Sequence, residues 1–96
     1  MFKDLNPLLH SELRLAIMSL LLSAEEADFV YIKEQTKSTA GNLSVQLDKL
    51  SSAGYIKIAK GFIGKKPNTS CKITNAGRVA FAEYVDALKS YIIPHP

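Results

Sequence analysis

The sequence predicts a domain of the α+β class, mainly α-helical, with three helices, a two-stranded hairpin and a final helix in that order. In the first half of the chain, leucines recur every three or four residues, which is the period of a helix with one buried face. After Gly54, apolar and basic residues alternate, which is the period of a half-buried strand. Because 96 residues suit one small domain, we expect residues 1–96 to form a single folding unit.

A cap residue followed by proline is a common helix start, so Asn6 and Pro7 predict a first helix from Leu8 to about Ser23. Its apolar residues form one row that is widened by further apolar residues on either side, which predicts burial on more than one side of the helix. The row consists of Leu13, Ile17, Leu20 and Leu21, and the residues that widen it are Leu9, Leu15, Met18 and Leu22.

A polar connection over residues 23–27 leads to Asp28, which can cap a second helix over residues 29–36. The residues of this helix expected to face inward are Phe29 and Ile32, with Val30 as a further candidate. Residues 37–38 are expected to form a short turn into the next helix.

The third helix, expected over about residues 39–53, is the most informative segment of the chain. Thr39 stands at the N-cap position, and Gly54 stands where a left-handed residue commonly ends a helix. An apolar stripe with i, i+4 and i+7 spacing consists of Leu43, Leu47 and Leu50. The opposite face is slender and mostly polar, and it carries Gly41, Asn42, Val45, Asp48 and Lys49. Because the major groove of DNA admits one helix, this face predicts a recognition helix.

The hairpin is expected over about residues 55–73, with strands at residues 55–60 and 69–73. Glycines, a proline and lysines over residues 61–68 predict a long basic loop between them. Thr74 is expected to cap a last helix over about residues 75–92. The residues expected to end it are Pro94 and Pro96. A helix–turn–helix followed by a hairpin is the winged helix-turn-helix arrangement.

Basic residues concentrate after the third helix. Residues 1–50 hold five Lys or Arg against seven Asp or Glu, whereas residues 51–96 hold seven against two. Phosphate binding depends on local potential, so this distribution favours a polyanionic partner. The lysines concerned are Lys57, Lys60, Lys65, Lys66 and Lys72.

Several classes of function are not expected. Cys71 is the only cysteine, and His10 and His95 stand far apart, so we expect no disulfide, metal site or cofactor. No glycine-rich phosphate loop or nucleophile motif suggests an enzyme. No apolar run approaches the roughly 20 residues that span a bilayer, and the N-terminus has no signal-peptide pattern, so a cytoplasmic protein is expected.

The chain resembles small winged helix-turn-helix transcriptional regulators of the MarR/ArsR-like group. The segments that carry the resemblance are residues 10–17, 41–44, 53–56, 60–67 and 73–78, with Leu47, Lys49, Leu50 and Thr69. The resemblance implies a homodimeric prokaryotic regulator that binds a pseudo-palindromic operator. MarR proteins usually carry additional helices, so their effector pocket is not assumed for this chain. ArsR-type metal sensing requires clustered ligands, and a lone Cys71 does not supply them.

The residues expected to bind DNA are Thr39, Gly41, Asn42, Ser44, Val45, Gln46 and Lys49 in the helix, with Lys65, Lys66, Asn68 and Thr69 in the wing. Asn42 can pair with an adenine edge or a phosphate, and Val45 can meet a thymine methyl or a neighbouring element. Gln46 can reach a base or pack against the second helix. The wing residues can follow the backbone, enter the minor groove or form a solvated loop. Asp48 is not expected to contact DNA, because its charge repels phosphate.

The last helix is apolar over more of its circumference than one small core requires, which predicts a surface for a second copy of the chain. The residues expected at this interface are Phe2, Leu5, Leu8, Phe81, Tyr84, Val85, Leu88, Tyr91 and Ile92. The alternative is that Phe2 and the C-terminal residues cover each other within one subunit.

The predicted function is a sequence-specific DNA-binding transcriptional regulator, acting as a repressor. The alternative function is a winged-helix module that binds a protein partner. The sequence identifies neither the operator nor an effector.

Overall fold

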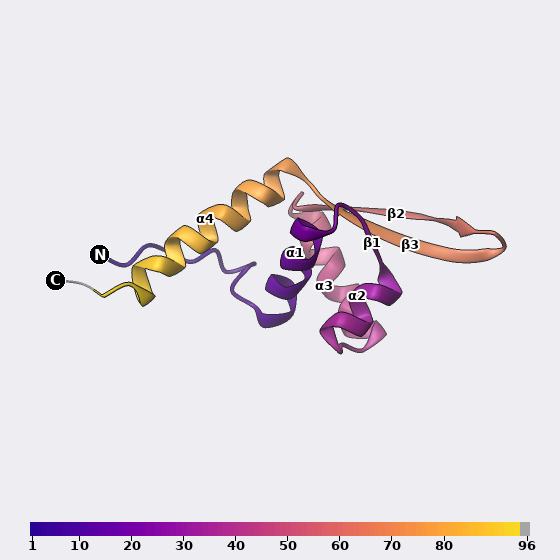
Figure 1. Cartoon of the computed structure of the whole chain (residues 1–96), viewed down its shortest axis with the longest axis horizontal. Coiled ribbons are helices and arrows are strands. Elements are labelled where there is room, and N and C mark those ends of the chain that lie inside the picture. The colour runs from indigo at the N-terminus through magenta and orange to yellow at the C-terminus, as the bar shows by residue number, and fades with distance from the viewer. Residues whose placement is uncertain (95–96) are drawn as a thin grey trace.

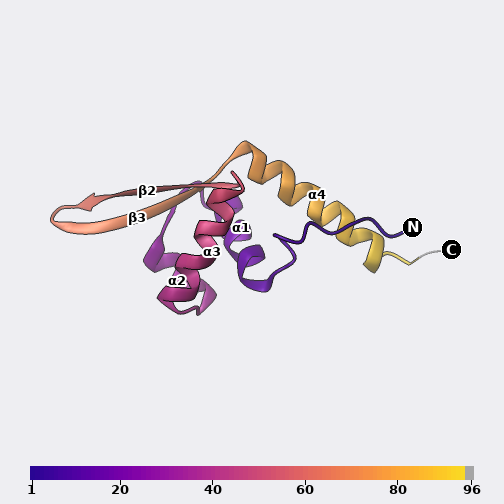
Figure 2. The same ribbon diagram turned by 180° about the vertical axis from the view of Figure 1, so that it is seen from behind.

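A computed structural model describes residues 1–94. The elements, in order, are α1 (Glu12–Ser23), β1 (Ala27–Asp28), α2 (Phe29–Thr36), α3 (Ala40–Ser52), β2 (Ile56–Ile63), β3 (Lys66–Ile73) and α4 (Asn75–Ile92). The predicted mainly helical α+β class is confirmed. The molecule measures 60 × 25 × 21 Å, because the β2–β3 hairpin extends from one end of the body and α4 from the other (Figures 1 and 2).

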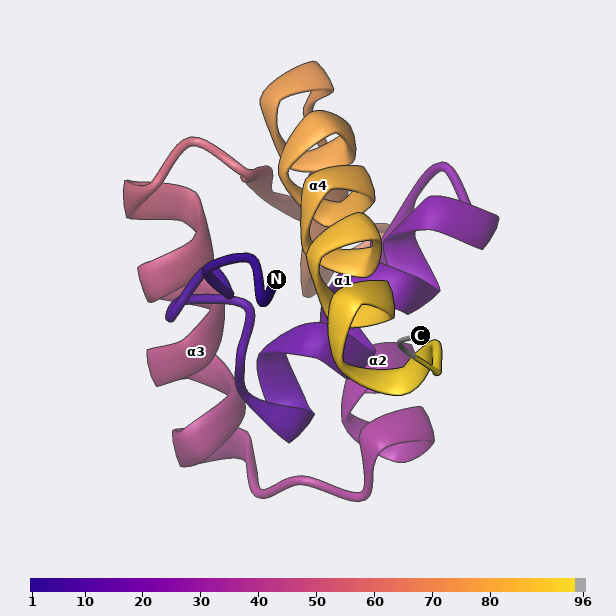
Figure 3. The ribbon, with the colours of Figure 1, turned by 90° about the vertical axis from the view of Figure 1, so that its left-hand side faces the viewer.

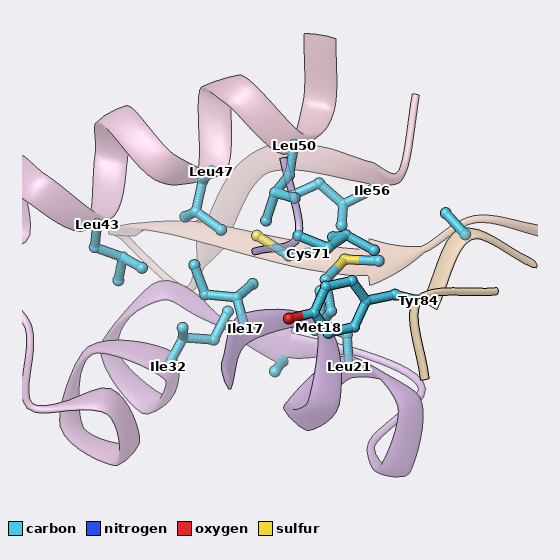
Figure 4. Packing of buried hydrophobic residues seen from close by; sticks show 13 residues of the cluster. Ile17, Met18, Leu21, Ile32, Leu43, Leu47, Leu50, Ile56, Cys71 and Tyr84 are labelled. Atoms are coloured by element: carbon cyan, nitrogen blue, oxygen red, sulfur yellow. The ribbon is translucent and has the colours of Figure 1, made fainter. Parts of the chain in front are cut away.

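The core lies between the first three helices and the base of the sheet. Figure 4 shows the leucines of α3 on one side, the α1 and α2 side chains opposite them, and Cys71 between. The fully buried or nearly buried residues of this cluster include Ile17, Met18, Leu21, Ile32, Leu43, Leu47, Leu50, Ile56 and Cys71. The predicted leucine stripe of α3 is therefore confirmed as the inward face of that helix.

The first helix begins later than the sequence predicted. The carbonyl side chain of Asn6 accepts a hydrogen bond from the Leu8 amide at 3.0 Å, which forms a turn instead of a helix start. Ser11 is the observed N-cap of α1, and its hydroxyl accepts from the Arg14 amide. The turn still buries Leu9 completely, which is why its apolar pattern resembled a helix.

The second and third helices have the predicted caps. The Asp28 side chain accepts from Tyr31 at the start of α2, and the Thr39 hydroxyl accepts from the Asn42 amide at 3.2 Å. Val30 is 60% exposed, so the expectation that it faces inward is wrong. Between the helices, Lys37 adopts a left-handed conformation with φ of 54°.

A Schellman motif ends α3. Gly54 has φ of 80°, as predicted for a left-handed residue after the helix. Its amide donates to the Ser51 carbonyl at 2.9 Å, and the Tyr55 amide donates to the Leu50 carbonyl at 3.0 Å. These bonds fix the direction in which the chain leaves α3 and enters the hairpin.

The sheet has three strands in the order β1-β3-β2, all antiparallel. The short β1 pairs Ala27 with Cys71, in a segment expected to be only a polar connection. The predicted loop over residues 61–68 is wrong, because β2 and β3 continue to the pair Ile63–Lys66. The two-residue turn makes Ile63–Lys66 a hydrogen-bonded pair. Because hydrogen-bonded and non-hydrogen-bonded pairs alternate, Pro67 lies in a non-hydrogen-bonded pair, where its missing N–H is not needed.

The start of α4 is tied to the end of α3. The Thr74 hydroxyl accepts from the Gly77 amide at 3.0 Å and donates to the Gly54 carbonyl at 2.6 Å. The Thr74 amide donates to the Tyr55 carbonyl at 3.0 Å. Pro94 follows the helix as predicted, whereas the expectations for His95 and Pro96 concern residues outside those described.

Cys71 is completely buried, and burial raises its pKa to about 11. We expect a thiol-specific disulfide reagent at pH 8 to modify the folded chain at least about 100-fold more slowly than the unfolded chain. Because the unfolded thiol ionises first, stability should fall as pH rises from about 9 to 11 and should not change through this group at lower pH. Equal modification rates in the folded and unfolded chains would contradict this assignment.

Candidate nucleic-acid interface

The outward flank of α3 is accessible along its length. Figure 3 shows α3 at the edge of the helical body, separated from α4. The exposed residues of this flank are Thr39, Gly41, Asn42, Ser44, Val45, Asp48 and Lys49. Val45 is 50% exposed, although it is apolar. Within residues 1–94, therefore, no other part of the chain covers the face opposite the leucine stripe, and this face can enter a groove in a ligand.

Gln46 differs from its neighbours because its side chain is already engaged within the chain. The Gln46 carbonyl oxygen accepts a hydrogen bond from Arg14 Nη1, and its Nε2 donates to Asn42 Oδ1 at 3.0 Å. Arg14 Nε also donates to the Leu8 carbonyl at 2.5 Å. Gln46 is therefore held by Arg14 of α1, whereas the expected alternatives were a base or the second helix.

These bonds determine which atoms Asn42 presents outward. Arginine has donors only, so the amide oxygen of Gln46 must face Arg14 and its NH₂ group must face Asn42. The Asn42 oxygen then faces Gln46, and its NH₂ group, in an exposed residue, is left to donate to a ligand. An asparagine held in this way can donate to the N7 acceptor of a purine. Sequence reasoning missed Arg14, because nothing in the sequence pairs residues 14 and 46.

We expect Arg14→Lys to weaken discrimination between DNA sequences. Lysine keeps the charge but lacks the fork that reaches Leu8 and Gln46 together. Competition between a preferred duplex and the same duplex changed at one purine should show discrimination reduced about 10-fold at that position. Affinity for mixed-sequence DNA should hardly change. Unaltered discrimination by the variant would refute the positioning role of Arg14.

The wing lies beside α3. Residues opposite each other in the hairpin share a face, so the pair Lys60–Thr69 lies on the same face as the buried pair Ile58–Cys71. A groove of about 300 Å³ separates this part of the wing from α3. The groove is lined by Phe29, Ser44, Leu47, Asp48, Ile58, Lys60 and Thr69.

The other predicted wing residues have separate positions. Lys65 is in the turn, whereas Lys66 and Asn68 are in β3 on the face away from α3. Lys60 was absent from the residues expected to bind DNA, although it lines the groove beside α3 together with Thr69. The signal in the sequence that could have found it is the alternation of β2, which places Lys60 on the same face as Ile56 and Ile58.

The wing has an uncompensated positive charge. No Asp or Glu occurs in the sequence between Asp48 and Glu83. The ion pairs found in residues 1–94 are Lys3–Asp86 and Lys72–Glu26, and neither includes Lys60, Lys65 or Lys66. Asp48 lines the groove with Lys60 without pairing to it. The local charge therefore favours a polyanion along the wing.

The chain matches the family described as a winged helix DNA-binding domain over residues 13–92. The chain belongs to this family. It is similar to an uncharacterized protein of Methanocaldococcus jannaschii, with 41% identity over 76 residues that cover 79% of this chain and 83% of that protein. A transcriptional regulator homologue from Pyrococcus horikoshii OT3 has a TM-score of 0.81 at 32% identity, over 88% of this chain and 84% of that chain. A mutant MarR from E. coli complexed with operator DNA has a TM-score of 0.66 at 18% identity, over 80% of this chain and 58% of that chain. The fold is that of MarR-type regulators.

This winged-helix chain carries a second exposed region along α4. Residues 2–5 run beside the last turns of the helix (Figures 1 and 2). Phe2 stacks on Tyr91 with ring centroids 5.1 Å apart, and the Tyr91 hydroxyl donates to the Lys3 carbonyl at 2.8 Å. Phe2 and Tyr91 thus contact each other within one subunit, yet they remain 58% and 45% exposed.

The other residues expected at an interface between copies differ in their exposure. Val85 and Ile92 are exposed, whereas Leu5, Leu8, Phe81 and Leu88 are half-buried. Tyr84 is only 4% exposed, and its hydroxyl lies 3.0 Å from His10 Nδ1. Its side chain is covered by its own subunit, so we remove Tyr84 from the surface available to a partner.

Within residues 1–94, no three His, Cys, Asp or Glu side chains gather where they could hold a metal ion. None of the helices there is both long and apolar enough to cross a membrane.

Proposed function

We propose that this chain is a sequence-specific transcriptional regulator that binds double-stranded DNA as a homodimer. The observation that carries the proposal is an accessible α3 flank that faces Lys60 across one groove, beside wing lysines that take no part in the ion pairs found in residues 1–94. A helix of this kind fits the major groove, while wing lysines beside it reach phosphates or the minor groove. The DNA complex of the MarR relative supports the same use of the fold.

The homodimer is proposed from the exposed arm formed by α4 and residues 2–5. Large apolar residues on this arm that are more than a third exposed include Phe2, Val85, Tyr91 and Ile92, although Phe2 and Tyr91 already contact each other. A second copy related by a twofold axis would cover them and would place two α3 helices on one duplex. Sedimentation should then give a mass near twice 10.5 kDa.

Repression is the proposed mode of regulation. A dimer that occupies both the groove and the adjoining backbone excludes other proteins from the DNA that it covers. We propose that it acts in the cytoplasm, where prokaryotic DNA is located. An effector is not part of the proposal.

Selection of bound duplexes from a random pool tests the proposal. The expected result is enrichment of an inverted repeat whose half-sites lie about 10 base pairs apart, centre to centre. Failure to enrich any sequence would refute sequence-specific binding. Enrichment of a single site without a repeat would refute the twofold dimer on DNA while leaving DNA binding intact.

A further inference from the structure

The tip of the wing exposes large apolar side chains. Phe62 is 73% exposed and Ile63 is 66% exposed, although both lie in β2. Hairpin strands are usually stabilised by packing one face on a core, whereas in residues 1–94 these two side chains remain mostly exposed. An exposed apolar group at the end of an extended element commonly marks a surface that meets a partner.

The register of the hairpin places Phe62 on the face toward α3. Phe62 pairs with Pro67, two residues beyond the Lys60–Thr69 pair that lines the groove. Phe62 therefore shares the face of Lys60, about 7 Å farther along the strand. Phe62–Pro67 is a pair without ladder hydrogen bonds, in which opposite side chains approach closely. Together these two residues form a compact apolar knob, which we call the wing wedge.

The surroundings of the wing wedge indicate the chemistry of its partner. Lys60, Lys65 and Lys66 flank it, and the hairpin contains no acidic residue. A partner must therefore offer negative charge at the rim and an apolar interior between the charges. A DNA duplex has both, since its phosphates flank a stack of bases that apolar side chains can enter from the minor groove.

We propose that the wing wedge enters a base step of the minor groove and kinks the duplex. This inference rests on the proposed DNA binding, in which α3 occupies the major groove and leaves the adjoining minor groove to the wing. Partial unstacking by Phe62 would bend the DNA toward the major groove by about 20–90°. The kink would bring more of the duplex against the body of the protein.

A tryptophan reporter can test the insertion directly, because the chain contains no tryptophan. Phe62→Trp places the only indole in the wing wedge, and Val79→Trp places it on α4 at a position that is 56% exposed in the natural chain. Each variant is titrated with a 24-base-pair mixed-sequence duplex at low salt, and binding is followed independently by the anisotropy of a dye on the DNA. Stacking on bases should reduce Phe62→Trp emission at least about twofold, with no change for Val79→Trp.

The duplex also reports the kink when its ends carry a donor and an acceptor dye. The unmodified chain should increase energy transfer, Phe62→Ala should not, and Ile63→Ala, on the opposite face of the strand, should match the unmodified chain. Binding without quenching or kinking would overturn the wing wedge and leave DNA binding in place. Absence of binding by anisotropy would overturn both proposals. Quenching or a blue shift with anionic vesicles, but not with duplex, would assign the tip to a lipid surface and overturn the inference.

Discussion

Duplex binding is expected to fall by about 100-fold or more at 100 mM salt when Lys65→Glu and Lys66→Glu are combined. Each reversed lysine removes a favourable phosphate contact and adds a repulsive one, and a dimer carries both changes twice. The slope of log affinity against log salt should decrease by about four. Because the lysines contact phosphates and not bases, the loss should be similar for all DNA sequences. Fluorescence anisotropy across a salt series measures both quantities.

The matched control changes the same number of charges on α4. Arg78→Glu and Lys89→Glu are exposed positions on α4, which leads away from the wing. This control should bind DNA far better than the wing variant, and both should retain the native sedimentation behaviour. Equal DNA binding by the wing variant and the unmodified chain would favour the alternative function, a module that binds a protein partner.

Gly77→Ala is expected to lower the free energy of unfolding by about 3 kcal/mol. This value is at the upper end of the range that is typical when a larger side chain is forced into a packed site. A Cβ at Gly77 would overlap the Tyr55 carbonyl oxygen and lie 2.9 Å from Ile73 Cγ1. The carbonyl cannot retreat freely, because it accepts the Thr74 amide that fixes the start of α4. For a domain of this size, the melting temperature should fall by about 10–20 °C in thermal unfolding followed by circular dichroism.

Gly41→Ala is the control for this prediction, since it makes the same change in an open helical position. Apart from the adjacent residues and the backbone of its own helix, no atom lies within 4 Å of a Cβ added at Gly41. Helix propensity then favours alanine, so stability should rise by up to about 1 kcal/mol. Similar melting temperatures for Gly77→Ala and the unmodified chain would show that the junction of α3 and α4 is not closely packed.

Local signals in the sequence predicted the elements that local chemistry determines. The caps at Asp28, Thr39 and Thr74 and the left-handed residue Gly54 all occupy the predicted positions. Each depends on residues a few positions apart, which is why one sequence suffices to locate them. The inward stripe of α3 could be predicted equally well, because the spacing of its leucines is a property of the helix alone.

Contacts between distant segments could not be predicted in the same way. The β1 strand exists because Ala27 pairs with Cys71, and two residues give no periodic signal of their own. The engagement of Gln46 depends on Arg14, thirty-two positions earlier. The length of the wing loop was overestimated because glycine and proline normally interrupt strands. Pro67 does not interrupt β3, because it lies in a non-hydrogen-bonded pair, where its missing N–H is not needed.

The central claim is that the outward flank of α3 meets the duplex, and amide chemical-shift mapping tests it most directly. An isotopically labelled sample titrated with duplex DNA should show its largest shifts at Gly41, Asn42, Ser44 and Val45, followed by the wing. The amides of α4 should change less, apart from those at a dimer contact. Shifts confined to α4 and residues 2–5, with the α3 flank unchanged at saturation, would contradict the account.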